Sequence, residues 1–304
     1  MSFASTTDTR IFIRYCLNYS ETDRCSSLEP YEIADHGWGE RVARVAVLTL
    51  AFFPTTFFLN AAYTESLFLA LSAGALWAAM VRKNLLLACV LAGLATATRN
   101  VGIFLLVPLA YEWMRNAEYY RWRVAYLAFA PTGLIHYMGY LWWKFGEPLL
   151  FYTEQSDWNR GATGPVATLE QSWAATVGGI QSVWNSVVEQ GFVGEKIMLY
   201  FNSLNNAYNL MFLIFAFALF VGGLRVLPFG LSAYVFLVAI FPAFFGTPGT
   251  PLMGLSRYVL VAFPLFIVLG VLLGRRWQVA AWLAASAAAS LIMCAMFVTW
   301  WYVA

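Results

Sequence analysis

Long apolar stretches, separated by short groups of charged residues, run through this chain from about residue 43 to its end. A bilayer core requires about 20 helical residues to cross it, and the backbone polar groups must bond within the helix. The stretches predict nine helical membrane segments, at residues 43–59, 62–81, 85–98, 100–113, 124–143, 198–221, 226–245, 256–274 and 277–303. Prolines within them, such as Pro54, Pro131 and Pro264, predict kinks rather than breaks. The predicted fold is therefore an all-α, polytopic membrane helix bundle.

Two of these segments, 85–98 and 100–113, are short and meet at Arg99 and Asn100. They form either one long helix with Arg99 in mid-membrane, or a hairpin of two shallow helices with Arg99 and Asn100 at its tip. Five basic residues flank the pair, which are Arg82 and Lys83 before it and Arg115, Arg121 and Arg123 after it. Because basic residues favour the inner side of a membrane, the hairpin is predicted, since it keeps all five on one side.

The hairpin also determines the expected orientation of the whole chain. The inner side then also receives Arg10, Arg14, Arg24, Arg41, Arg44, Arg225, Arg275 and Arg276, so that thirteen of the eighteen basic residues lie inside. This distribution predicts an inner N-terminus and an outer C-terminus. The chain then divides into a polar inner segment at 1–41, membrane helices at 42–143, an outer connection at 144–197 and membrane helices at 198–304.

Apolar residues recur in steps of three or four within the outer connection, at Leu169, Trp173, Val177, Ile180, Trp184 and Val187. This spacing predicts an amphipathic helix. Beside a membrane, such a helix lies flat on the outer surface with its tryptophans in the interface. The alternative is that the connection folds as a small soluble cap.

Composition excludes several classes of protein. Hydrophobic residues make up 61% of the chain and charged residues 11%. In soluble domains, hydrophobic residues make up about 45–50% and charged residues about 25%. An ordinary soluble enzyme and a disordered chain are therefore excluded, and the net charge of +2 gives no basic face for a nucleic acid. The four cysteines, Cys16, Cys25, Cys89 and Cys294, follow no metal-binding or redox spacing, so neither a metal site nor a bound cofactor is expected.

The few ionisable residues in the predicted segments are the candidates for function, because a charge at membrane depth is costly. Glu65 begins the second segment, where it either interacts favourably with the helix dipole or forms a site together with Asn60 and Tyr63. Arg99 either extends its head group to the interface or, at the tip of a hairpin, binds an anion with two parallel hydrogen bonds.

Further candidates lie at the outer ends of later segments. Arg257, which precedes Tyr258, stands at a helix start, where a cation is unfavourable unless an anion binds beside it. The outer connection brings Gln155, Trp158 and Arg160 close together in sequence. One acid and three arginines from four different segments are thus expected in the outer half of the bundle. This combination suits an anionic lipid-phosphate ligand.

Three stretches have a recognisable pattern, which are Ala51–Phe68 (AFFPTTFFLNAAYTESLF), Ala92–Gly102 (AGLATATRNVG) and Ser256–Pro264 (SRYVLVAFP). They resemble the GPI mannosyltransferase II (class V) family, and look closest to its prokaryotic relatives among the GT-C glycosyltransferases. Segments similar to Gly146–Pro148 and Gln155–Arg160 also follow the middle span in those relatives. The resemblance covers residues 40–265, and several motifs recur in the same order.

The resemblance implies transfer of a hexose, typically mannose, from a polyprenyl-phosphate-linked donor to a hydroxyl of a lipid-linked or membrane acceptor. The reaction takes place on the outer or lumenal face with inversion. Such chemistry requires a base at the acceptor hydroxyl and cationic or hydrogen-bonding groups at the leaving phosphate. By resemblance, Arg99, Asn100 and Arg257 bind the donor phosphate, while Glu65 is a candidate for the base or for a binding role. The expected partners are membrane lipids and the donor, with no nucleic acid, and the expected location is a prokaryotic plasma membrane.

The chain departs from the family pattern at its start. The family places an essential aspartate in a first outer loop, after a first membrane helix, whereas no segment is predicted here before residue 43. A chain that lacks one helix pair, with impaired activity, is therefore expected. Asp35 is a possible substitute, but the predicted orientation places it inside. Two alternative functions remain, which are a transporter of lipids or sugar-lipids and a non-catalytic subunit whose membrane partner supplies the missing helices.

Overall fold

The computed structural model describes residues 29–156, 161–191 and 194–299. These residues form a bundle of helices. In the described part, the only strands are β1 (Gly161–Ala162) and β2 (Phe245–Gly246), which pair antiparallel over two residues each. The prediction of an all-α fold is confirmed.

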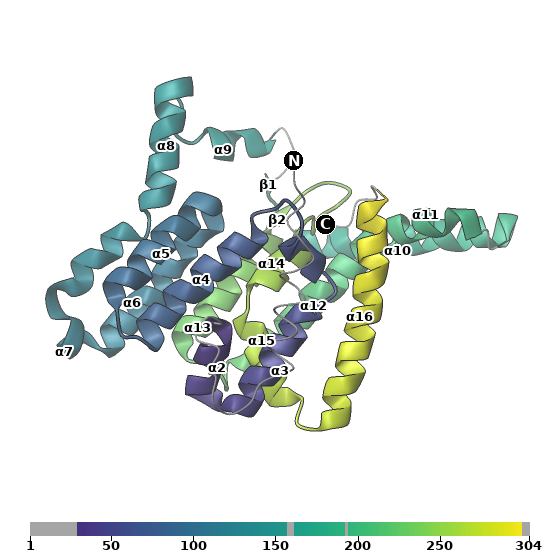
Figure 1. Cartoon of the computed structure of the whole chain (residues 1–304). Helices are drawn as coiled ribbons and strands as arrows, with labels where there is room; N and C mark the ends of the chain where they lie inside the picture. The colour runs from purple at the N-terminus through teal and green to yellow at the C-terminus, as the bar shows by residue number, and fades with distance from the viewer. Residues whose placement is uncertain (1–28, 157–160, 192–193, 300–304) are drawn as a thin grey trace, which may run out of the picture.

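The helices follow one another along the whole described chain (Figure 1). The α-helices are α2 (Glu29–Trp38), α3 (Glu40–Ala51), α4 (Glu65–Met80), α5 (Leu85–Thr98), α6 (Leu106–Arg115), α7 (Ala117–Tyr120), α8 (Thr132–Phe145), α9 (Leu150–Thr153), α10 (Pro165–Gln190), α11 (Ile197–Ser203), α12 (Asn205–Gly223), α13 (Phe229–Val235), α14 (Leu255–Val261), α15 (Pro264–Leu272) and α16 (Arg276–Val298). The 3₁₀-helices are η1 (Thr56–Leu59), η2 (Asn100–Leu105), η3 (Arg121–Phe129), η4 (Glu154–Ser156), η5 (Gly194–Lys196) and η7 (Phe241–Phe244), and η6 (Phe236–Ile240) is a π-helix.

Two helices, α12 and α16, are long and apolar enough to cross a membrane, and the pair α14 and α15 meets the same test only when its two parts are joined. That pair bends by 76° at its break. The described residues therefore contain two such helices, or three with the bent pair, which is fewer than the nine membrane segments that hydropathy predicts. Each of the nine predicted segments does contain helix.

Breaks next to prolines explain much of this difference. Pro54 follows α3, Pro131 immediately precedes α8, and Pro264 begins α15. Proline lacks a backbone N–H and disfavours a helical conformation in the residue before it, so that an apolar stretch continues while the helix does not. The expectation of kinks rather than breaks is therefore wrong at these three positions.

The segment from 83 to 115 reverses its direction, as the charge pattern predicts. Lys83 before α5 and Arg115 at the end of α6 both contact the carboxylate of Glu112, at 3.9 and 3.1 Å. Arg99, between α5 and η2, has an extended backbone that ends the helix. Close packing follows at Gly102, where an added Cβ would lie 2.8 Å from the carbonyl carbon of Ala95. The two ends of the hairpin therefore meet at Glu112, with Arg99 at the turn.

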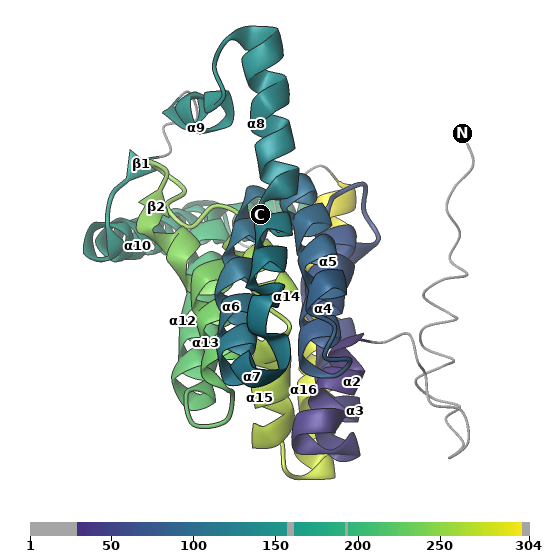
Figure 2. The ribbon, with the colours of Figure 1, turned by 90° about the vertical axis from the view of Figure 1, so that its left-hand side faces the viewer.

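The predicted segment 124–143 does not form one span. Its first part is η3, and its second part is α8, which projects beyond the end of the bundle in both ribbon views (Figures 1 and 2). The base of α8 packs closely on α5, since an added Cβ at Gly133 would lie 2.2 Å from the carbonyl oxygen of Gly93. Within α8, only Leu141 is buried.

Residues 29–41, the described part of the predicted polar segment 1–41, pack against the helix bundle. Helix α2 buries Ile33 and Ala34 almost completely and lies against α3 and α4. The indole of Trp38 donates a hydrogen bond to the carbonyl of Val226, and that of Trp77 donates one to Glu32. Residues 29–41 therefore belong to the helix bundle, and residues 1–28 lie outside the described part.

Candidate functional site

Three charged side chains from separate parts of the sequence converge near one end of α4. Glu65 is the first residue of α4, Arg99 lies at the turn of the hairpin, and Arg257 lies in the first turn of α14. The Nη1 atom of Arg99 donates a hydrogen bond of 2.7 Å to Oε1 of Glu65, and Nη1 of Arg257 lies 3.7 Å from the same oxygen. The Glu65 side chain is 2% exposed, against 13% for Arg99 and 23% for Arg257. The structure thus brings together Glu65, Arg99 and Arg257, three of the four charged residues that the sequence singles out, while the fourth, Arg160, lies outside the described residues.

Aromatic rings also contact both guanidinium groups. The guanidinium of Arg99 lies over the ring of Tyr258 at 5.2 Å and near that of Phe68. The guanidinium of Arg257 lies over Tyr63 at 5.2 Å and near Phe58. Such cation–π contacts contribute about 0.5–2 kcal/mol each, more where water is excluded. The carboxylate and the rings together restrict the positions of both arginines.

Two polar atoms of this cluster are buried without a hydrogen-bond partner among the described residues, which are Oε2 of Glu65 and Nε of Arg257. A buried polar atom without a partner costs about 1–3 kcal/mol. Native structures retain few of them, so each position calls for an explanation such as a bound water or ligand. The Arg257 guanidinium therefore retains hydrogen-bonding capacity for a further acceptor.

The geometry bears on the two roles expected for Glu65. A general base must come within hydrogen-bonding distance of the hydroxyl from which it takes a proton. The Glu65 side chain is almost fully buried, and its one bonded oxygen is occupied by Arg99. In this geometry Glu65 holds the two arginines with Oε1, while its second oxygen, Oε2, is buried without a hydrogen-bond partner among the described residues.

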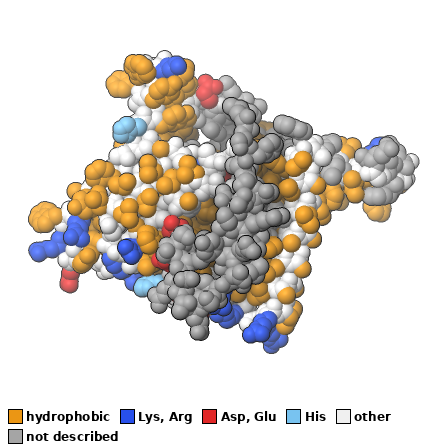
Figure 3. All heavy atoms as spheres, in the orientation of Figure 1, with side chains coloured by type: hydrophobic (Ala, Val, Ile, Leu, Met, Phe, Trp, Pro, Cys, Tyr) orange, Lys and Arg blue, Asp and Glu red, His pale blue; other side chains and the backbone are white. Residues whose placement is uncertain are grey.

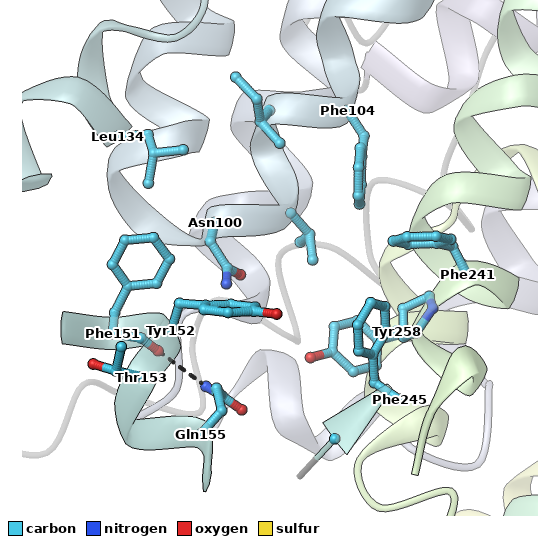
Figure 4. A pocket seen from close by; sticks show the side chains of 14 residues that line it. Asn100, Phe104, Leu134, Phe151, Tyr152, Thr153, Gln155, Phe241, Phe245 and Tyr258 are labelled. Carbon is cyan, nitrogen blue, oxygen red and sulfur yellow. Dashed lines mark hydrogen bonds between the residues drawn. The ribbon is translucent and has the colours of Figure 1, made fainter. Parts of the chain in front are cut away.

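A cavity of about 730 Å³ lies beside this cluster (Figure 4). Most of its lining is apolar or aromatic, and the lining residues are Asn100, Val101, Ile103, Phe104, Leu134, Phe151, Tyr152, Thr153, Gln155, Gly161, Phe241, Pro242, Phe245 and Tyr258. In Figure 4, Asn100 and Gln155 face Tyr258 and Phe245 across the cavity, and the Gln155 amide donates to the carbonyl of Phe151. A largely apolar ligand that carries a polar group matches this lining.

The cavity and the charged cluster adjoin each other at two residues. Tyr258 lines the cavity while its ring contacts Arg99, and Asn100 lines the cavity directly after Arg99 in the sequence. The guanidinium groups of Arg99 and Arg257 are not themselves among the lining groups. The predicted single cleft is therefore divided into an apolar cavity and an adjacent polar cluster.

The remaining predicted site residues fall in different places. Tyr63 is part of the cluster through Arg257, and Gln155 lines the cavity. Asn60 is exposed at the end of η1 and does not line the cavity, so the structure does not bring it into the site. Trp158 and Arg160 lie outside the described residues.

Asp35 is the residue that could replace the essential aspartate of the family, and it lies far from the charged cluster. It belongs to α2, whose Glu32 accepts a hydrogen bond from Trp77, twelve residues along α4 from Glu65. At 1.5 Å per residue, that separation corresponds to about 18 Å. Asp35 therefore does not join the charged cluster of Glu65, Arg99 and Arg257.

Sequence reasoning missed the aromatic walls of the cavity, which are Phe104, Phe151, Tyr152, Phe241 and Phe245. Aromatic residues make up 18% of the chain, so their presence in a segment gives no specific signal. Within the described residues, no group of three His, Cys, Asp or Glu side chains is arranged to hold a metal ion.

Comparison with known proteins adds no assignment, because no family model, no curated protein and no solved structure matches the chain. The resemblance to the GPI mannosyltransferase II family therefore depends on the sequence motifs alone.

Proposed function

We propose that this chain is a membrane hexosyltransferase of the GT-C type. It transfers a hexose, most simply mannose, from a polyprenyl-phosphate donor to a hydroxyl of a lipid-linked or membrane acceptor on the outer face. The observation that supports this proposal is the pair of arginines fixed on the buried Glu65 carboxylate directly beside an apolar, aromatic cavity. A polyprenyl phosphate has the matching chemistry, since it joins an apolar chain to an anionic group.

In the proposed reaction, the bond between the anomeric carbon and the phosphate oxygen breaks while the acceptor oxygen attacks from the opposite face. Polyprenyl phosphate leaves, and the acceptor proton passes to a base that is not assigned among the described residues. Arg99 and Arg257 stabilise the negative charge that develops on the leaving phosphate. Asn100 and Tyr258 contact the donor where the cavity meets the cluster, and Glu65 holds the arginines in place. No metal and no bound cofactor takes part in the proposal.

The proposal includes nine membrane segments, with α12 and α16 as uninterrupted spans, the pair α14 and α15 as a broken span, and α4 and α5 as shorter apolar helices. It places the N-terminus inside and the C-terminus outside, in a prokaryotic plasma membrane. Basic side chains gather along the lower edge of the molecule, near the end of α6 and the start of α16 (Figure 3), which supports one common inner side. In a variant without native cysteines, single cysteines at positions 83 and 115 are expected to react from the same side of the membrane, and one at position 144 from the other side.

The activity is tested with the purified full chain in lipid nanodiscs, supplied with radiolabelled polyprenyl-phosphate-mannose and a membrane lipid extract as acceptor. The chain is expected to transfer label to the lipid acceptor and to release polyprenyl phosphate. Arg99→Ala is expected to lower transfer by about 10²–10³-fold, the cost of removing one charge-stabilising donor. Arg82→Ala is the matched control, because Arg82 lies over Trp77 at the far end of α4.

Three outcomes would overturn the proposal. Absence of transfer from every polyprenyl-phosphate hexose would remove the enzymatic function. Movement of labelled lipid across proteoliposomes without transfer would favour the transporter hypothesis. Copurification of a membrane protein without which no transfer occurs would favour the hypothesis of a subunit.

A further inference from the structure

The surface of α10 is divided into three sides. At 3.6 residues per turn, one side contains Thr168, Ser172 and Thr176, all of which are buried. A second side, about a quarter turn away, contains large apolar residues that are exposed, which are Val166, Leu169, Trp173, Ile180, Trp184 and Val188. The side opposite to this apolar stripe contains exposed polar residues such as Gln171 and Ser182. The predicted amphipathic helix is thus confirmed as a helix over Pro165–Gln190, but its apolar side is not the side that packs.

The packing of α10 prevents the apolar stripe from turning inward. Thr168 and Ser172 donate their hydroxyl hydrogens to the carbonyl oxygens of Gly164 and Thr168, so that these buried groups are satisfied within the helix. The helix packs against α12, and at Gly179 an added Cβ would lie only 2.1 Å from the carbonyl oxygen of Ser203. A rotation would replace this close contact by bulky side chains. Trp173 and Trp184 are accordingly 65% and 68% exposed.

The direction of α10 differs from that of the candidate spans. Figure 1 shows it running sideways past the upright α16 and beyond the bundle, and α12 runs upright in Figure 2. It lies near the end of the bundle at which α12 begins and α16 ends. This is the level at which spanning helices leave the hydrocarbon core, and tryptophan is enriched at that level.

We propose that the apolar stripe of α10 is inserted into the headgroup region of the outer leaflet. Three features favour a lipid surface as its occupant. The stripe is continued by exposed Ile197 and Leu199 of α11, which lead into the exposed apolar face of the candidate span α12. The three sides match the three surroundings of an interfacial helix, with lipid on the apolar side, water on the opposite side and protein on the flank. Finally, α10 contains no lysine or arginine, so its binding depends on apolar burial rather than on anionic lipids.

The position of α10 has a consequence for the cavity. The amide of Gly164, just before α10, donates to the carbonyl of Phe244, and the amide of Gly246 donates to the hydroxyl of Thr163. The pairing of β1 with β2 connects the same two segments, and Gly161 and Phe245 line the cavity. A helix held in the headgroup region therefore holds this wall of the cavity at the same depth. This inference does not depend on the transferase activity.

Spin labels on single cysteines, in a variant without native cysteines and with a monodisperse elution profile, test the proposal in phosphatidylcholine nanodiscs. Labels at positions 173, 180 and 184 are expected to collide with oxygen and to be shielded from a water-soluble nickel complex. Labels at the control positions 171 and 182 are expected to show the reverse. Replacing part of the phosphatidylcholine by phosphatidylglycerol is expected to leave these values unchanged.

Two results would overturn the proposal. High accessibility to nickel at all five positions would place α10 in water, as a soluble cap. Low accessibility to both reagents at 173, 180 and 184 would show that protein, including a second copy of the chain, covers the stripe. A measurement without labels uses quenching of tryptophan fluorescence by brominated lipids. Trp173→Phe and Trp184→Phe are each expected to reduce the fraction of tryptophan fluorescence that the brominated lipids quench. The control is Trp38→Phe, which removes a part-buried indole that donates a hydrogen bond to the carbonyl of Val226. This control is expected not to reduce that fraction.

Discussion

Arg99 and Glu65 lie 34 positions apart in the sequence, and the guanidinium of Arg99 donates a hydrogen bond of 2.7 Å to the carboxylate of Glu65. Both side chains are largely shielded from water, where a charge-assisted hydrogen bond is strong. Arg257 approaches the same carboxylate oxygen, so that one acid supports two cations that otherwise repel each other. The carboxylate therefore keeps the start of α4, the tip of the hairpin and the start of α14 in one arrangement.

Replacing this carboxylate by an amide tests its supporting role. Glu65→Gln keeps the shape of the side chain but removes its charge, which leaves Arg99 and Arg257 close together without an anion. The free energy of unfolding is expected to fall by about 3–5 kcal/mol, the usual cost of breaking a buried ion pair. Titration with a denaturing detergent, or thermal unfolding in micelles, measures this loss.

The matched control is Glu40→Gln. Glu40 pairs with Arg44 four residues later, and both side chains are about half exposed. Since exposed pairs contribute little, the expected change is below about 0.5 kcal/mol. Equal losses in the two variants would contradict the special role of Glu65.

The ring of Tyr258 is expected to matter more than its hydroxyl group. It lies under the guanidinium of Arg99 and also lines the cavity, so that it couples the cluster to the ligand space. Tyr258→Leu removes the cation–π contact, whose contribution of about 0.5–1 kcal/mol corresponds to a rise in the donor KM of roughly two- to fivefold. Tyr258→Phe keeps the ring and is expected to leave KM unchanged. An equal effect of both substitutions would instead assign the contribution to the hydroxyl group.

The sequence predicts the reversal of the chain at Arg99, because the charges at both ends of the hairpin are visible as Lys83 and Arg115. Hydropathy does not predict where helices break, since the apolar character of a stretch continues through Pro131 or Pro264 although the backbone hydrogen bonding does not. The projection of α8 beyond the bundle depends on its packing against α5 at Gly93 and Gly133, which is a tertiary contact that no local pattern reports.

The charged part of the candidate site is predicted well for a physical reason. Charged residues make up only 11% of the chain, so each one within an apolar segment is conspicuous. The sequence accordingly predicts the convergence of Glu65, Arg99 and Arg257, whereas Arg160, which the same prediction includes, lies outside the described residues. The sequence does not predict the separation of the cavity from the arginines, because this separation depends on aromatic side chains such as Phe241 that are common throughout the sequence.

The ionisation of the Tyr120 hydroxyl group is expected to make the stability of the fold depend on pH in the alkaline range. Burial raises the pKa of Tyr120 above its usual value, and the nearby Glu112 carboxylate raises it further. The unfolded chain ionises this phenol near pH 10, while the folded chain still holds the proton. Stability is therefore expected to fall as the pH rises above about 10.

Tyr120→Phe removes this dependence. Because the hydroxyl group is buried without a hydrogen-bond partner among the described residues, its removal is expected to leave stability at pH 7 unchanged or slightly higher. Thermal unfolding between pH 8 and 11 measures the difference, with the exposed neighbour Tyr119→Phe as the control. A loss of stability at pH 7 in Tyr120→Phe would show that the hydroxyl group has a stabilising partner.

Substitutions at two glycines of α8 distinguish the effect of close packing on stability from the effect of helix propensity. An added Cβ at Gly133 would lie 2.2 Å from the carbonyl oxygen of Gly93, a backbone atom that cannot move aside without displacing α5, whereas nothing lies within 4 Å of such an atom at Gly139. Gly133→Ala is therefore expected to lower the unfolding temperature and, because Leu134 lines the cavity, to weaken donor binding as well. Gly139→Ala is expected to raise stability by up to about 1 kcal/mol, since alanine favours a helix more than glycine does. Thermal unfolding of both variants in the same detergent measures the contrast. Equal stability of Gly133→Ala and Gly139→Ala would contradict the close packing of α8 on α5. It would also contradict the position of Leu134 in the wall of the cavity.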